Sequence, residues 1–127
     1  MNTSPQKRVL IIDDDEGLTE PLQMAIEAEG YQVMVAHDGN EGLMKIERDA
    51  PDLVLLDLVM PRRSGFAVLD NILINSRHRT PKIVMVTGNS EPKYRELALD
   101  RGVDRFIPKP YHIEDLVKTV NELLATE

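Results

Sequence analysis

The sequence Leu-Val-Leu-Leu-Asp at residues 53–57 is the stretch that decides the fold. Four consecutive apolar residues without polar alternation are typical of a strand buried on both faces, as in a parallel sheet covered by helices. The run ends in Asp57, and Pro61 prevents a simple continuation of the strand. Open α/β sheets bind ligands at the carboxyl ends of their strands. An isolated aspartate there is more often a helix cap or a turn residue, so the rest of the chain has to decide its role.

A second uninterrupted apolar run at residues 9–12 ends in Asp13, Asp14 and Asp15. Three further strands are predicted over residues 31–36, at an edge of the sheet, over 82–86 and over 105–107. Helical periodicity follows each strand. The predicted helices start near Gly17 or Thr19 and end at Gly30, then cover residues 41–48, residues from 66 onward, residues 92–101 and residues 113–125. The late start of the first helix is expected because Pro21 would remove a hydrogen bond in a longer one.

Five alternating strands and helices with short connections predict an α/β fold with a parallel sheet and right-handed crossovers. We expect the flavodoxin-like, doubly wound (βα)5 arrangement with strand order 2-1-3-4-5. In that order the first and third strands are neighbours. Asp13 and Asp14 would then lie beside Asp57.

Composition limits what the chain does. Its 127 residues are 42% hydrophobic and 29% charged, which indicates one globular domain. The net charge of −7 provides no basic field for nucleic acid, and the absence of cysteine excludes disulfides and thiolate chemistry. Residues 1–8 are predicted to be a polar tail. The apolar run after it is too short for a signal peptide or a membrane span, so we expect a cytoplasmic protein without membrane contact.

Three crowded carboxylates repel one another, and a hard divalent cation would relieve the repulsion. Oxygen ligands without histidine or cysteine indicate Mg²⁺, with Mn²⁺ as the alternative. The other interpretation is that residues 13–15 only cap a helix, and we assign Asp15 to that role.

Two more strand ends carry groups that suit an anion. Thr87 offers a hydroxyl and Gly88 allows close backbone approach, whereas Lys109 supplies a cation. Each is common elsewhere, and only their combination is informative. The Lys109-Pro110 bond is left open as cis or trans.

These motifs, together with the loop from Met60-Pro61 to Ser64-Gly65, resemble the receiver domain of bacterial two-component response regulators, the CheY-like family. The resemblance covers residues 8–125, and we assign 9–127 to the domain. It implies that Asp57 accepts a phosphoryl group from a sensor histidine kinase or a histidine phosphotransfer protein. It also implies metal ligation by Asp14, Asp57 and the backbone carbonyl of Val59, with Asp13 acting through metal-bound water.

The resemblance further implies that Lys109 neutralises the phosphoryl oxygens, and that Thr87 and the switch aromatic Phe106 respond to phosphorylation. Val59 and Gly88 would contribute backbone groups to the phosphoryl loop. The output face would be residues 91–125. Val59 and Asn89 are expected to influence access of hydrolytic water. The three histidines are expected at the surface, away from the strand ends.

Three other functions fit the sequence less well. A phosphatase of the haloacid-dehalogenase type needs an acid two residues after the nucleophile, where this chain has Val59. A flavodoxin-type FMN carrier needs a hydroxyl- and glycine-rich loop where this chain has aspartates. A phosphorylation-independent interaction module would not need a complete site motif. We therefore expect a phosphoacceptor rather than a turnover enzyme.

Overall fold

The computed structural model describes residues 6–58, 64–75, 80–88 and 91–125. The described strands form one parallel sheet in the order β2-β1-β3-β4-β5. The strands are β1 (Arg8–Ile12), β2 (Gln32–Ala36), β3 (Leu53–Leu56), β4 (Lys82–Thr87) and β5 (Arg105–Pro108). The helices are α1 (Glu16–Glu27), α2 (Gly39–Asp49), α3 (Gly65–Asn75), α4 (Pro92–Asp100) and α5 (Ile113–Ala125). The predicted fold class and strand order are confirmed.

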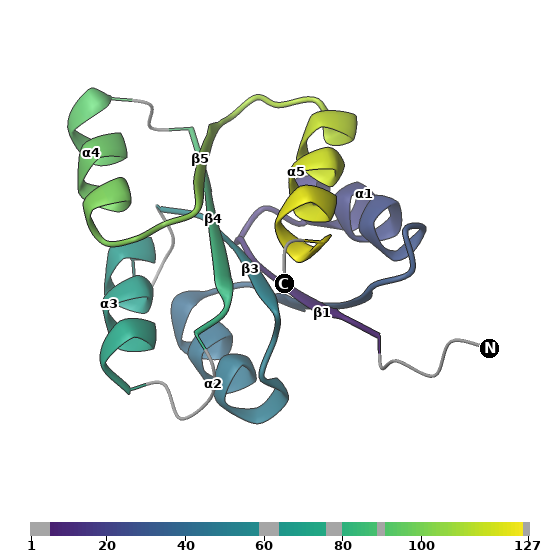
Figure 1. Ribbon diagram of the computed structural model, residues 1–127, viewed down its shortest axis with the longest axis horizontal. Coiled ribbons are helices and arrows are strands. Elements are labelled where there is room, and N and C mark those ends of the chain that lie inside the picture. The colour runs from purple at the N-terminus through teal and green to yellow at the C-terminus, as the bar shows by residue number, and fades with distance from the viewer. Residues whose placement is uncertain (1–5, 59–63, 76–79, 89–90, 126–127) are drawn as a thin grey trace.

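Helices cover both faces of the sheet. Figure 1 shows α1 and α5 on one face and α2, α3 and α4 on the other. The apolar run of β3 alternates between the two cores: Val54 and Leu56 pack into the one under α2, α3 and α4, and Leu53 and Leu55 into the other. All four side chains are buried, as an uninterrupted apolar strand requires.

Helix α1 begins earlier than predicted. Asp15 is its N-cap, and a carboxylate oxygen of Asp15 accepts a hydrogen bond from the Leu18 N–H at 3.3 Å. The cap assigned to Asp15 is therefore confirmed, but the expected start at Gly17 or Thr19 is wrong. Pro21 lies inside the helix. The turn that Asp15 caps lies before Pro21 in the chain. Pro21 has no N–H, so the helix lacks one interior hydrogen bond, but its first residue is unaffected.

One other boundary differs from the prediction, and several apolar helical residues are exposed. Strand β1 includes Arg8, which the sequence placed in the tail, because Arg8 pairs with Gln32 of β2 in the parallel sheet. Leu73 on α3 is 46% exposed, whereas Val68 on the same helix is fully buried. On α4 only Ala98 of the adjacent apolar residues 97–99 is buried, since neighbouring helical positions point about 100° apart.

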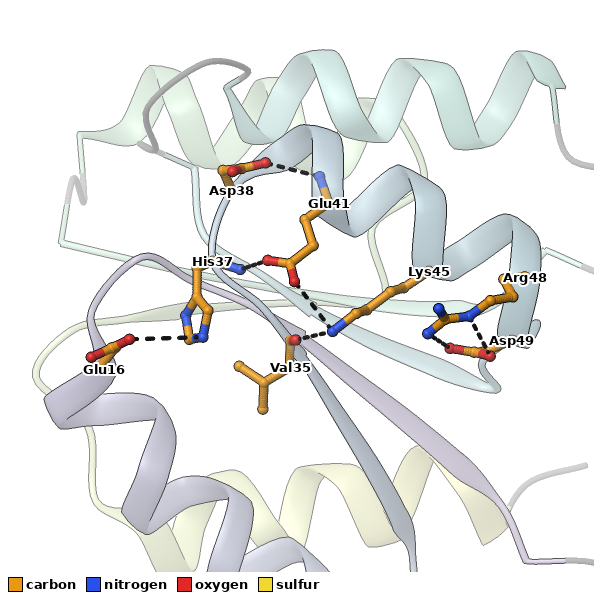
Figure 2. A network of polar contacts seen from close by, with 8 residues as sticks. All are labelled: Glu16, Val35, His37, Asp38, Glu41, Lys45, Arg48 and Asp49. Carbon is orange, nitrogen blue, oxygen red and sulfur yellow. Dashed lines mark hydrogen bonds and ion pairs between the residues drawn. The ribbon is translucent and has the colours of Figure 1, made fainter.

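The N-terminus of α2 carries a polar network (Figure 2). Asp38 accepts from the Glu41 N–H at 2.8 Å, and the Glu41 carboxylate accepts from the His37 N–H at 2.7 Å. This reciprocal pattern resembles a capping box and explains why α2 starts before residue 41. His37 is exposed, but it directly follows β2, so its predicted place away from the strand ends is wrong. His112 is exposed, and His78 lies outside the described residues.

Gly42 marks a close approach between α2 and β1. A Cβ at this position would lie 2.6 Å from Cδ1 of Ile12, a side chain that is fully buried. Glycine in a helix interior weakens the helix by up to about 1 kcal/mol. The packing shows that it also lets α2 lie close to the sheet.

Membrane spanning is not supported by the described helices. The longest of them, α5, has 13 residues, and none is long and apolar enough to cross a bilayer.

Candidate functional site

The two central strands end at the same level. Ile12 of β1 pairs with Leu56 of β3, and the Asp57 N–H donates to the Ile12 carbonyl at 3.0 Å. Asp13 and Asp57 are the next residues along the two strands. The parallel register therefore places side by side two carboxylates that are far apart in the sequence.

Asp13, Asp14 and Asp57 form one carboxylate cluster, as the sequence predicted. One oxygen from each lies within 4.8 Å of the others. Asp13 and Asp57 are only 8% and 7% exposed, whereas Asp14 is exposed. Partial burial raises the cost of holding like charges together, and carboxylate oxygens are the donors that hard divalent cations prefer. The donor set fits such an ion.

Lys109 provides the cation of the cluster. Its Nζ lies 2.7 Å from Oδ2 of Asp13 and 3.5 Å from Oδ2 of Asp57. Burial alone would lower the pKa of Lys109, but the hydrogen bond to Asp13 and the charges of Asp13 and Asp57 outweigh it and raise the pKa above its ordinary value. Lys109 therefore stays charged and bridges the two buried carboxylates.

The fourth and fifth strands bring the remaining groups to the same edge. Thr87 pairs with Pro108, and the Lys109 N–H donates to the Thr87 carbonyl at 2.8 Å. Thr87 is fully buried, and a Cβ on Gly88 would point into open space, clear of the described residues beyond its chain neighbours. The Lys109–Pro110 peptide bond is cis. Phe106 is partly buried against the core under α2, α3 and α4.

Gly65 holds the start of α3 against the backbone that carries Asp57. Its N–H donates to the Leu58 carbonyl at 2.8 Å. A Cβ at this position would lie 2.7 Å from Cα of Leu58 and still closer to the carbonyl oxygen of Asp57. Only glycine allows this approach, so residue 65 helps to define where Asp57 sits.

Tyr111 is a neighbour of the site that the sequence did not single out. It lines a small hollow together with Asp13 and Asp57. Burial raises the pKa of the Tyr111 hydroxyl, and the charge of Asp13 adds to that effect against the opposing charge of Lys109. The sequence signal that could have identified Tyr111 as a neighbour of the site is its position two residues after Lys109. Val59 and Asn89, which the sequence also implicated, lie outside the described residues.

A doubly wound parallel sheet with acids, a hydroxyl and a lysine at its carboxyl edge defines a class of phosphoryl-signalling domain. The family model of the response regulator receiver domain matches residues 9–121. The chain belongs to this family, whose members are the receiver domains of two-component response regulators.

Characterised relatives support this assignment. The chain is 37% identical over 117 residues to the transcriptional regulatory protein CpxR of Escherichia coli K12, covering 92% of this chain and 49% of that protein. The response regulator MprA of Mycobacterium avium is 36% identical, with 92% and 50% covered. The chain thus spans about half the length of these curated relatives.

A solved structure agrees over nearly the whole chain. A CheY-like receiver domain protein from Methanospirillum hungatei superimposes with a TM-score of 0.86 at 33% identity, covering 95% of each chain. A DNA-binding response regulator of the LuxR family from Staphylococcus aureus gives a TM-score of 0.81 at 29% identity, with 92% and 98% covered.

Proposed function

We propose that Asp57 accepts a phosphoryl group from the phosphohistidine of a sensor histidine kinase or a histidine phosphotransfer protein. The observation that carries the proposal is that Asp57 ends a central strand beside Asp13, with Lys109 bridging the two carboxylates. A carboxylate nucleophile that forms an aspartyl phosphate is established covalent chemistry.

The transfer needs little beyond position and charge. An oxygen of Asp57 attacks phosphorus, the bond from phosphorus to the donor imidazole nitrogen breaks, and the electron pair leaves with the imidazole. Lys109 lies 3.5 Å from Asp57 and stabilises the phosphoryl oxygens. Asp13, Asp14, Asp57 and the Val59 carbonyl would hold Mg²⁺, which neutralises phosphoryl charge when bound.

The phosphoryl group would act as a switch. It adds roughly two negative charges and several acceptors next to Thr87, Lys109 and the Gly88 backbone. Thr87 then bonds a phosphoryl oxygen, and Phe106 follows by packing alone because it has no hydroxyl. The output face over residues 91–125 responds as a shift between two populations. The transcriptional regulatory protein CpxR and the response regulator MprA are both about twice this length, so an output domain is the proposed recipient of the signal.

The chain acts as a phosphoacceptor and not as a turnover enzyme. A phosphatase of the haloacid-dehalogenase type would need an acid at position 59, which is valine. Apolar Val59 and polar Asn89 would instead give the acyl phosphate an intermediate lifetime by controlling hydrolytic water. If Val59→Asn left the dephosphorylation rate unchanged, this part of the proposal would be wrong.

Intact mass measurement after exposure to acetyl phosphate and Mg²⁺ tests the central claim. We expect one added phosphoryl group on the wild-type protein and none on Asp57→Asn. Asp52→Asn, at the amino end next to the same strand, is the matched control and should be phosphorylated like the wild type. Absence of added mass on the wild type, or its retention in Asp57→Asn, would refute the proposal and favour a phosphorylation-independent interaction module.

A further inference from the structure

Helix α4 buries few of its side chains. It has nine residues, of which only Ala98 is buried, and its N-cap residue Glu91 makes no side-chain capping bond. Leu97 and Leu99 are 42% and 43% exposed. Elements with little buried apolar surface open or shift at low free-energy cost, so side chains that reach α4 from its neighbours have a large effect on its position.

Side chains of α3 contact α4 at both of its ends. At the C-terminal end, Nε of Arg101 donates to Oδ1 of Asp70 at 2.9 Å, and the guanidinium lies 5.0 Å from the ring centre of Phe66. At the N-terminal end, the ring of Tyr94 stacks on Phe66 with centroids 6.3 Å apart and an interplanar angle of 26°. Phe66 therefore contacts both ends of α4, which lies beside α3 in Figure 1.

The same turn of α3 also touches the backbone of the phosphoacceptor. Phe66 directly follows Gly65, whose N–H is bonded to the Leu58 carbonyl. Phe66 and Tyr94 pack against the same core cluster as the switch aromatic Phe106. A displacement of α4 would thus have to break the Asp70–Arg101 pair and the ring contacts within reach of the site.

We propose that Phe66, Asp70 and Arg101 form a clamp that holds α4 in place and opposes the switch of the output face. The proposal rests on the proposed phosphoacceptor function and adds a regulatory device to it. Because the clamp contacts exist only with α4 in this position, removing them should favour the displaced population. A ligand that prefers the displaced state then binds more tightly.

Two measurements on the full chain test the clamp. The first is amide hydrogen exchange of residues 92–100, and the second is the apparent affinity for beryllofluoride, a phosphoryl mimic, in the presence of Mg²⁺. The variants are Arg101→Met, which removes the guanidinium, and Asp70→Asn, which removes only the charge of its partner. Arg48→Met is the matched control because Arg48 pairs with Asp49 on α2, away from α4.

We expect Arg101→Met to speed exchange over α4 several-fold and to raise the beryllofluoride affinity about three- to ten-fold. Asp70→Asn should do the same to a smaller extent, and Arg48→Met should change neither quantity. Unchanged or weakened beryllofluoride binding in both Arg101→Met and Asp70→Asn would overturn the proposal. If the wild type does not bind beryllofluoride, the proposed function fails, and unchanged α4 exchange in both variants would then separately refute the clamp.

Discussion

At the residue scale, the chemistry of the site depends on a residue that has no side chain. Gly65 packs directly against the backbone of Asp57 and Leu58, so Asp57 is positioned by helix α3 as well as by its own strand. The side chains that carry charge, Asp13 and Lys109, then complete the arrangement around Asp57. Positioning and charge thus come from different elements.

Substituting Gly65 with alanine should separate the two contributions. The new Cβ would collide with main-chain atoms, which cannot rotate away, so we expect a loss of about 2 kcal/mol in the free energy of unfolding. Phosphorylation by acetyl phosphate should slow as Asp57 is displaced. Urea denaturation and intact mass measure the two effects.

Gly17→Ala is the control for this experiment. Gly17 lies in the first turn of α1, where a Cβ would approach only Oδ1 of Asp15, at 3.3 Å, among the described residues. It should be tolerated or slightly stabilising. Equal behaviour of the two alanine variants would contradict the positioning role of Gly65.

At the scale of elements, the contact between α2 and β1 shows packing overriding helix propensity. Alanine at position 42 would favour the helix by up to about 1 kcal/mol, but overpacking against Ile12 costs about 1–3 kcal/mol. We therefore expect Gly42→Ala to destabilise the protein by about 1 kcal/mol, measured by urea denaturation.

The Ile12→Val background provides the decisive comparison. This change removes Cδ1, the atom that would lie nearest to the alanine methyl group, at 2.6 Å. Cγ1 and Cγ2 of residue 12 would remain 3.0 and 3.1 Å away, so Gly42→Ala should cost less in that background but still cost something, a non-additivity that reports direct contact. The same cost in both backgrounds would show that Ile12 is not the obstacle.

The capping network of α2 predicts a dependence on pH. The hydrogen bond from the His37 N–H lowers the pKa of Glu41, and Lys45 adds to this against the opposing effect of burial. Because the pKa of Glu41 is lower in the folded protein than in the unfolded chain, where it is near 4.5, the ionised carboxylate stabilises the fold above pH 4.5. This contribution is lost as the pH falls through the pKa of the folded state. Glu41→Gln should therefore be less stable than the wild type at pH 7, by about 0.5 kcal/mol.

Urea denaturation at pH 7 and at pH 3 measures this difference, which should shrink in acid. The exposed Glu20 on α1 supplies the control, and Glu20→Gln should show a smaller change with pH. The role assigned to the Glu41 carboxylate would be contradicted if the loss of stability in Glu41→Gln stayed constant or grew between pH 7 and pH 3.

At the scale of the whole molecule, a bound divalent ion should stabilise the native state, because the three carboxylates come together only when the sheet is formed. Mg²⁺ at ten times its Kd should contribute about 1.4 kcal/mol and raise the melting temperature. Calorimetry with and without EDTA measures the shift. Asp57→Asn should lose most of it, and Asp100→Asn, at the end of α4, should keep it. An equal shift in both variants would argue against the cluster as the ion site.

The fold and most of the site could be predicted because uninterrupted apolar runs, Gly and Pro stops and strand-end acids are local patterns. Helix faces were less predictable: among residues 97–99 the sequence could not say that only Ala98 turns inward. The start of α1 was missed because the cap by Asp15 prevailed over the expected effect of Pro21. The first error arises because packing selects which helix face is buried, and the second because one local signal, the cap, outweighed another, the proline.

The stretch Leu53–Leu56 followed by Asp57 by itself determined a doubly buried parallel strand with a carboxylate at its end. The tertiary structure alone decided how Asp57 is held: the register with β1, the 2.7 Å contact between Lys109 and Asp13, and the approach of Gly65. The physical reason is that periodicity and residue type encode which faces are buried. Distances between residues far apart in the chain are set only when the helices pack onto the sheet.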